Sequence, residues 1–229
     1  MGPRYAIYYA PKPGSKLARF GAEWLGYDIT TGATLPQPVL CKISSERLCE
    51  ITAEPRRYGF HATLKPPFSL AEGCDAAALD AAVAALAADA EAFEAPRLQL
   101  TCLTGFWALT FSEPCPEMDR LAERCVAEFD RFRAPPSPTE FARRREAGLS
   151  LAQEALLRRW GYPYVMTEFR FHMTLTGRLD PVEGAQVAAE LAPLCAPFCE
   201  SGLLIDAIGL FRQTPDHPFR LLRHYKLTG

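Results

Sequence analysis

The 229-residue chain is long enough to bury a substantial core, and its 48% hydrophobic and 23% charged residues are typical of a globular protein. A net charge of −2 argues against a protein that binds extended nucleic acid, since such proteins normally carry a strong basic excess. No apolar run approaches the roughly 18 residues that cross a membrane, and the eight cysteines contain no Cys-x-x-Cys pair, so we expect a reduced, cytoplasmic protein without a signal peptide.

The first part of the chain mixes strand-length apolar runs with helical periodicity. We expect a strand over 4–10, a helix over 15–25 capped by Ser15, and a long Gly-, Thr- and Pro-rich segment over 26–57 with one helical turn near 44–51. The length of 26–57 is typical of a lid or binding loop. Next come a strand from 58 that Pro66 and Pro67 end, an Ala-rich helix over 75–93, a hairpin of 98–103 and 106–111, and a helix over 116–132.

A Pro-rich segment over 135–138 is the predicted joint between two approximate halves, 1–134 and 139–229. The second half contains a predicted helix over 149–160, a strand over 168–176, a helix over 181–194 and strands over 203–211 and 219–227. Each half thus offers one motif strand, a helix and two further strands. This order predicts an α+β fold in one bilobal domain, with two antiparallel sheets facing a central cleft and helices outside.

One heptapeptide pattern occurs twice in this chain. Residues 58–64 (YGFHATL) and 169–175 (FRFHMTL) both read aromatic, any residue, Phe, His, any residue, Thr, Leu. Side chains two residues apart share one face of a strand, so His61 lies with Thr63, and His172 lies with Thr174. The alternate positions are largely apolar and predict a core face. The repeat therefore predicts two imidazoles that face one substrate from approximately symmetric walls.

A structural explanation also exists, because a lone histidine on a strand is often just a hydrogen-bonded or half-exposed residue. Packing, however, requires apolar periodicity and does not require His-x-Thr twice. Each copy also places a cation on the histidine face, Lys65 in the first and Arg170 in the second. The duplicated motif therefore favours a functional site.

Two facing histidines suit general acid–base hydrolysis of a phosphodiester. With an unperturbed pKa near ~6.5, one ring can take a proton from water while the other donates one to the departing sugar oxygen. Thr63 and Thr174 would donate hydrogen bonds to the non-bridging oxygens, and Lys65 or Arg170 would neutralise the phosphate. The remaining substrate-binding candidates are Tyr58, Tyr164 and Thr176, with Tyr162–Tyr164 either a stacking wall or a packed turn.

Other chemistries have weaker support in the sequence. Two histidines with only Glu168 nearby make a poor metal cage, so we expect no metal and no cofactor. No Gly-x-Ser-x-Gly elbow or Gly-rich phosphate loop is present. Arg143–Arg145 is either a terminal-phosphate site or a solvated run. His217 and His224 are expected on the surface, and Tyr5, Tyr8 and Tyr9 are expected in the core, with one phenol able to reach the cleft.

The two His-x-Thr motifs resemble those of the 2H phosphoesterase superfamily. The longer stretches 4–11, 58–68, 159–165 and 169–177 resemble its DUF1045-like branch, described as phosphonate-metabolism proteins. The resemblance implies a bilobal fold with both motifs lining a central groove, and metal-independent cleavage of cyclic phosphodiesters. It also implies His61, Thr63, His172 and Thr174 as the catalytic set.

The same resemblance suggests a small-molecule substrate such as a phosphorylated ribose 1,2-cyclic phosphate. Processing of RNA 2′,3′-cyclic ends or 2′-5′ linkages is an alternative that uses the same residues, and a non-catalytic phosphate-ligand binder is another. Which histidine is the acid, the oligomeric state and the mobility of 26–57 stay open at this point.

Overall fold

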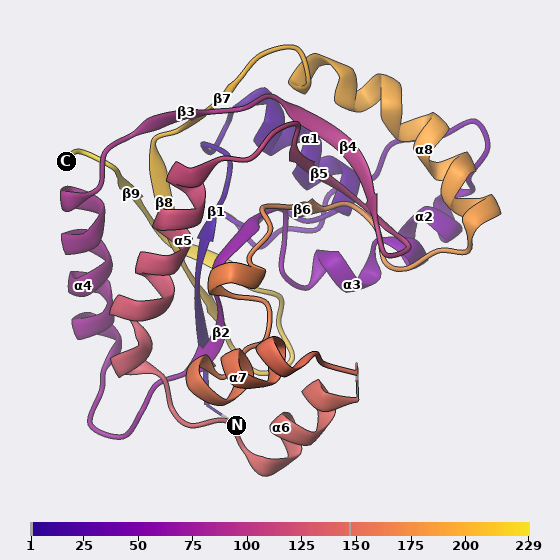
Figure 1. Ribbon diagram of the computed structural model, residues 1–229. Helices are drawn as coiled ribbons and strands as arrows, with labels where there is room; N and C mark the ends of the chain where they lie inside the picture. Colours follow the sequence, from indigo (N-terminus) through magenta and orange to yellow (C-terminus); the bar gives the residue numbers. More distant parts are fainter. Residues whose placement is uncertain (1, 147) are drawn as a thin grey trace.

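The computed structural model describes residues 2–146 and 148–229. Within these residues the strands form three antiparallel sheets, which agrees with the predicted α+β class (Figure 1). The largest sheet has the order β2 (Ala62–Ser69), β1 (Arg4–Tyr9), β8 (Ala207–Gln213) and β9 (Arg220–Lys226). The second has the order β4 (Leu98–Leu103), β5 (Phe106–Phe111) and β6 (Met173–Thr174), and β3 (Phe93–Ala95) pairs with β7 (Leu203–Ile205).

Both larger sheets combine strands from the two sides of the Pro-rich joint. The four-stranded sheet takes β1 and β2 from before it and β8 and β9 from after it, while β6 crosses back to pair with β5. The predicted halves, 1–134 and 139–229, therefore do not correspond to the two sheets. The physical reason lies in β1, where Ala6, Ile7 and Tyr8 are all fully buried. A strand buried on both faces takes a central position with a neighbour on each side, and β8 supplies the second neighbour.

Helices cover the outer faces of the sheets. α4 (Ala76–Asp89) packs against β8 and β9, α5 (Pro116–Glu128) packs against β2, and α8 (Pro181–Cys195) packs against β4 and β5. α1 (Lys16–Leu25) begins at Ser15, whose hydroxyl accepts a hydrogen bond from the Ala18 amide, as the sequence predicted. α7 (Leu151–Trp160) lies beside α6 (Pro138–Arg145) near the end of β2 (Figure 1). The helix α6 was not predicted; it begins inside the Pro-rich segment, with Ser137 as its cap.

The two motif strands are shorter or displaced relative to the prediction. β2 begins only after His61 and continues through Pro66 and Pro67, which were expected to end it. Because β2 is an edge strand, a proline that lacks an amide hydrogen costs it no ladder bond on the open side. β6 has just two residues. The predicted strand over 203–211 divides at Asp206, because β7 pairs with β3 and β8 pairs with β1.

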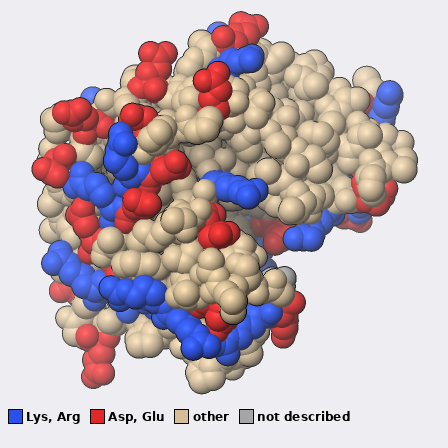
Figure 2. All heavy atoms as spheres, viewed as in Figure 1, with Lys and Arg blue, Asp and Glu red and all other residues tan. Residues whose placement is uncertain are grey.

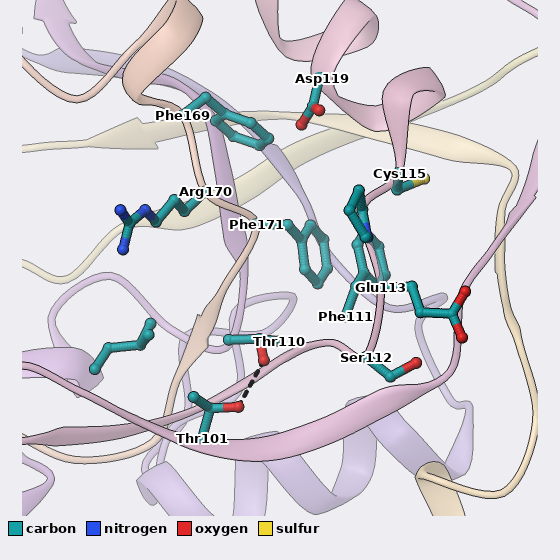
Figure 3. A pocket seen from close by; sticks show the side chains of 12 residues that line it. Thr101, Thr110, Phe111, Ser112, Glu113, Cys115, Asp119, Phe169, Arg170 and Phe171 are labelled. Carbon is teal, nitrogen blue, oxygen red and sulfur yellow. Dashed lines mark hydrogen bonds between the residues drawn. The ribbon is translucent and has the colours of Figure 1, made fainter.

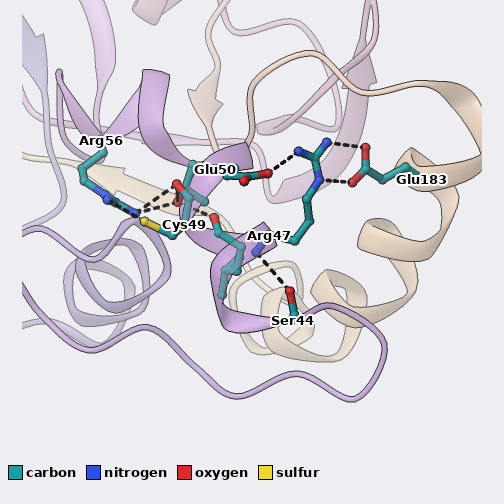
Figure 4. Close-up of polar contacts among 8 residues, drawn as sticks. Ser44, Arg47, Cys49, Glu50, Arg56 and Glu183 are labelled. Carbon is teal, nitrogen blue, oxygen red and sulfur yellow. Dashed lines mark hydrogen bonds and ion pairs between the residues drawn. The ribbon is translucent and has the colours of Figure 1, made fainter.

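The segment 26–57 is attached to the rest of the protein at several points. It contains α2 (Ser45–Ile51) and α3 (Ala53–Arg56). The Arg47 guanidinium donates to both carboxylate oxygens of Glu183 on α8, at 2.6 and 2.9 Å, and also pairs with Glu50 (Figure 4). Arg56 donates to the Leu25 carbonyl at 2.6 Å. The Arg47 contact holds α2 against α8, and the Arg56 contact holds α3 against the end of α1.

The four-stranded sheet is apolar on both faces. One face contributes Tyr5, Ile7 and Tyr9 to the main core, which extends to α4 and α5. The other face carries a small separate cluster, which consists of Ala6, Tyr8, Ala10, Phe211 and Phe219. This second cluster forms the floor beneath the first motif. None of the helices in the described part of the chain is long and apolar enough to cross a membrane.

Candidate active site

His61 is held by the turn that leads into β2. Gly59 in this turn has φ +76°, and a Cβ at that position would lie 2.0 Å from Cγ2 of Ile29, so the turn requires glycine. His61 Nδ1 donates to the Gly59 carbonyl at 2.8 Å, and Nε2 lies 3.1 Å from the Thr63 hydroxyl. A carbonyl can only accept, so Nδ1 carries the proton and Nε2 of the neutral ring holds the lone pair.

His172, in the second motif, repeats the first of these two contacts. Its Nδ1 donates to the carbonyl of Arg170, again two residues earlier, at 2.8 Å. Thr174 follows in β6, where it pairs with Ala108 of β5. The two copies of the motif thus fix both imidazoles through the same ring nitrogen. In each ring Nε2 is the atom available for proton transfer.

A buried tyrosine lies against the first histidine. The Tyr8 ring stacks on His61 with a centroid distance of 3.8 Å and an interplanar angle of 28°. Tyr8 pairs with Thr63 across β1 and β2, and its hydroxyl has no hydrogen-bond partner among the described residues. Tyr8 is fully buried, which confirms the predicted core position. Alternation on β1 places it on the face opposite Tyr5 and Tyr9, beside the first motif.

A cavity of about 230 Å³ brings the two motifs together. His61 and Tyr58 line one side, and Thr174, Thr176 and Phe106 line the other. His172 and Thr63 are not among the lining residues, but the ring centroid of His172 lies 5.9 Å from that of the lining residue Phe106.

Burial favours the neutral form of both imidazoles by lowering their pKa values. Burial lowers the pKa of His61 to about 4; its bond to the Gly59 carbonyl opposes this effect, and the charge of His172 adds to it. Burial also lowers the pKa of His172, against the opposing effect of the Arg170 carbonyl.

Lys65 lies away from this site, so its predicted position beside the motif is wrong. The register between β1 and β2 shifts between Ile7, which pairs with Lys65, and Tyr8, which pairs with Thr63. The extra residue in β2 is a β-bulge, and it reverses the alternation on which the prediction depended. The Lys65 side chain is 2% exposed and donates to the Val126 carbonyl at 3.0 Å, beneath α5.

The other predicted binding residues have different surroundings. Arg170 is exposed beside Phe169 and Phe171 and lines a neighbouring cavity of about 410 Å³ (Figure 3). Thr176 is buried, and its hydroxyl accepts a hydrogen bond from the Trp107 amide at 2.9 Å. Tyr164 is 44% exposed and makes an edge contact with Tyr162, outside the cavity between the motifs.

The described residues contain no group of three or more His, Cys, Asp or Glu side chains placed to hold a metal ion. Of the remaining histidines, His217 is exposed, as predicted. His224 is half-buried instead, with Nε2 lying 3.3 Å from the Ala10 carbonyl.

Comparison with known proteins gives one family and several relatives. The family described as "Protein of unknown function (DUF1045)" matches residues 63–220. A protein from Janthinobacterium sp. (strain Marseille), named ribose 1,5-bisphosphate phosphokinase PhnN, is 40% identical over 222 residues, which are 94% of this chain and 49% of that protein. A protein of the same name from Laribacter hongkongensis (strain HLHK9) is 39% identical over 181 residues, covering 79% of this chain and 41% of that one.

This chain therefore spans about half the length of the curated relatives that it matches. Among solved structures, E. coli LigT complexed with 3′-AMP has a TM-score of 0.46 at 11% identity, and LigT complexed with NADP+ has a TM-score of 0.45 at 11% identity. Both alignments cover the whole of each chain.

Proposed function

The chain belongs to the DUF1045 family, the branch that its longer sequence stretches resembled. We propose that it hydrolyses a cyclic phosphodiester of a small phosphorylated sugar or nucleotide. The observation that carries the proposal is the matched geometry of the motif histidines. Each ring donates its Nδ1 proton to the carbonyl two residues earlier, which leaves both Nε2 atoms for proton transfer. Such a pair supports one reaction that needs a base and an acid at once.

The difference between the two histidines supports an assignment of roles. His61, whose pKa burial lowers to about 4, stays neutral and acts as the base. Its Nε2 takes a proton from water as the water oxygen attacks phosphorus. His172 binds a proton when the phosphodiester anion enters, because a nearby negative charge raises its pKa. It then gives that proton to the sugar oxygen as the phosphorus–oxygen bond of the ring breaks.

The threonines and the tyrosine complete the proposed site. The hydroxyl of Thr174, and that of Thr63 once it turns from His61 Nε2 to the substrate, donate hydrogen bonds to the non-bridging oxygens, where negative charge increases in the transition state. The Tyr8 ring fixes the plane of His61 by stacking. The product is an open phosphomonoester, and exchange with solvent restores both histidines. No metal or cofactor takes part in this scheme.

The name of the curated relatives supports a phosphorylated ribose as the substrate class, since it refers to ribose 1,5-bisphosphate. The kinase activity in that name is not proposed for this chain. Phosphate-binding loops of the Gly-x-x-x-x-Gly-Lys-Ser/Thr type need a lysine after glycine, and each lysine in this sequence follows another residue.

A panel of cyclic substrates tests the proposal directly. We expect the protein to open the ring of a ribose 1,2-cyclic phosphate or a 2′,3′-cyclic mononucleotide, and phosphorus NMR measures this reaction. We expect EDTA to leave the rate unchanged. An oligonucleotide with a 2′,3′-cyclic end serves as the comparison substrate. Faster turnover of the oligonucleotide would favour the RNA-end alternative, and binding without turnover of any substrate would contradict hydrolysis.

The pH dependence should reflect the depressed histidine pKa values. The parameter kcat/KM reports on the free enzyme, so it should fall on the acid side as His61 gains a proton near pH 4. It should fall on the alkaline side as His172 loses its proton, through a pKa that burial holds below the ordinary value for histidine. The alkaline limb of kcat should lie at higher pH, because bound phosphate raises the pKa of His172. A kcat/KM that keeps rising to pH 8 would exclude this assignment.

A further inference from the structure

A small basic cavity lies where the start of β1, the end of β2 and α6 meet. It measures about 60 Å³, and its charged side chains are Arg4, Arg133, Arg144 and Glu140. Water occupies about 30 Å³ per molecule in the liquid, so the cavity has room for one tetrahedral oxyanion. We propose that this cavity binds a phosphomonoester group of the substrate, remote from the diester that reacts at the histidines. The inference rests on the proposed function and adds a second anchoring point to it.

The arginine charges in this cavity are only partly balanced. Arg144 pairs with Glu140 at 2.7 Å through one nitrogen, while its buried Nε has no partner among the described residues. Arg4 is held by the neutral Gln213 amide, and no carboxylate of the described residues lies within ion-pair distance of it. Buried guanidinium groups normally find hydrogen-bond partners. An incoming phosphate would supply acceptors for both Arg144 Nε and Arg4.

Arg133 also lines the cavity, and its guanidinium is already engaged in an ion pair. Its Nε pairs with Asp130 at 2.8 Å, and Asp130 also faces Lys65 at 3.8 Å. One carboxylate is therefore shared between two cations. The four cations Arg4, Arg133, Arg144 and Lys65 outnumber the two carboxylates, Asp130 and Glu140. The resulting excess of positive charge favours the binding of an anion.

Several aromatic side chains connect this cavity to the catalytic histidines. Arg4 and Tyr8 point to the same side of β1, about 13 Å apart along the strand at about 3.3 Å per residue. The Phe219 ring lies between them, 5.5 Å from the Arg4 guanidinium carbon and 5.9 Å from the Tyr8 centroid. Tyr8 in turn stacks on His61. Tyr8 and Phe219 are fully buried, so these rings form the packed floor between the two cavities, and the proposal requires a sugar phosphate with groups at both ends to lie over this floor.

Arg144 is held in place by an aromatic ring. Its guanidinium carbon lies 4.7 Å from the centroid of the Tyr162 ring. This contact orients the planar guanidinium without using its nitrogens, so that the nitrogens not paired with Glu140 stay available for phosphate. Figure 2 shows Lys and Arg side chains gathered in a band over the part of the surface that α6 and α7 form. The band would attract an anion toward the cavity.

The first experiment measures binding without catalysis. D-ribose 5-phosphate and D-ribose are titrated into the protein by calorimetry, with Arg144→Gln and Arg4→Gln as the test variants. Arg143→Gln is the matched control, because Arg143 is an exposed neighbour on the same helix and lies outside the cavity. We expect ribose 5-phosphate to bind, the test variants to weaken it roughly 10- to 100-fold, and the control to stay within twofold. Equal losses in all three variants, or none, would overturn the proposal.

The second experiment separates this inference from the proposed function. The kcat/KM values for ribose 1,2-cyclic phosphate with and without a 5-phosphate are compared. In the unaltered protein we expect the phosphorylated substrate to be preferred, and we expect Arg144→Gln to reduce this preference at least tenfold, mainly through KM. Turnover with no preference would overturn the phosphate subsite and leave the hydrolase standing. Arg144-dependent binding of ribose 5-phosphate without turnover of any cyclic ester would support the subsite and overturn the hydrolase.

Discussion

Replacement of either motif histidine by alanine should lower kcat for a cyclic phosphodiester by roughly 10²- to 10⁴-fold, the usual contribution of general acid–base catalysis. His61 and His172 act in one step of the proposed reaction, so the double variant should be little slower than either single variant. Initial rates followed by phosphorus NMR provide the measurement.

His217→Ala is the matched control for these variants. His217 is an exposed histidine outside the cavity, and its removal should leave kcat within about twofold. Because His61 stacks on Tyr8, His61→Gln is a useful second variant that retains side-chain volume. Thermal unfolding distinguishes lost catalysis from lost folding. Full activity in a folded His61 or His172 variant would rule out the two-histidine mechanism.

Removal of a motif hydroxyl should lower kcat by roughly 10²- to 10³-fold, as for the loss of one oxyanion-stabilising donor. The test variants are Thr63→Val and Thr174→Val, which keep the branched shape of the side chain. Since the hydroxyls are proposed to act mainly in the transition state, KM should change much less than kcat.

Thr63→Ser and Thr174→Ser keep the hydroxyl and serve as controls, with most of the activity expected to remain. Thr63→Val also removes the partner of His61 Nε2, so its pH profile should change as well. If the valine and serine variants are equally active, the hydroxyls have no role in stabilising the transition state.

The sequence predicted local geometry better than strand pairing. The hairpin over 98–103 and 106–111 appears at the predicted residues, since turn chemistry and alternation are local signals. The partners of β1 could not be predicted in this way. Its two-sided burial indicates a central strand, but the choice of β8 as neighbour depends on contacts across more than two hundred residues of chain.

At the candidate site, strict alternation was sufficient to predict that His61 and Thr63 lie together, and it failed to predict the position of Lys65. The failure follows from one register shift in β2, which the sequence pattern does not predict. The same limit applies to Arg4, whose position beside Arg144 follows from the docking of α6 near the N-terminal end of β1. Alternation assigns a side chain to a face only for as long as the ladder is regular.

The exchange of strands between the two sides of the Pro-rich segment has a consequence for how the protein would respond to being cut. A nick within 135–137 should leave two fragments that stay associated, because β1 and β8, and β5 and β6, belong to different fragments yet share hydrogen-bonded ladders. Neither fragment contains a complete larger sheet, so each would expose unpaired strand edges when expressed alone. His61 and His172 come from different fragments, so the proposed reaction would require the fragments to reassemble. The chain is thus suited to fragment complementation, in which recovery of the proposed activity reports that two separately produced fragments have associated.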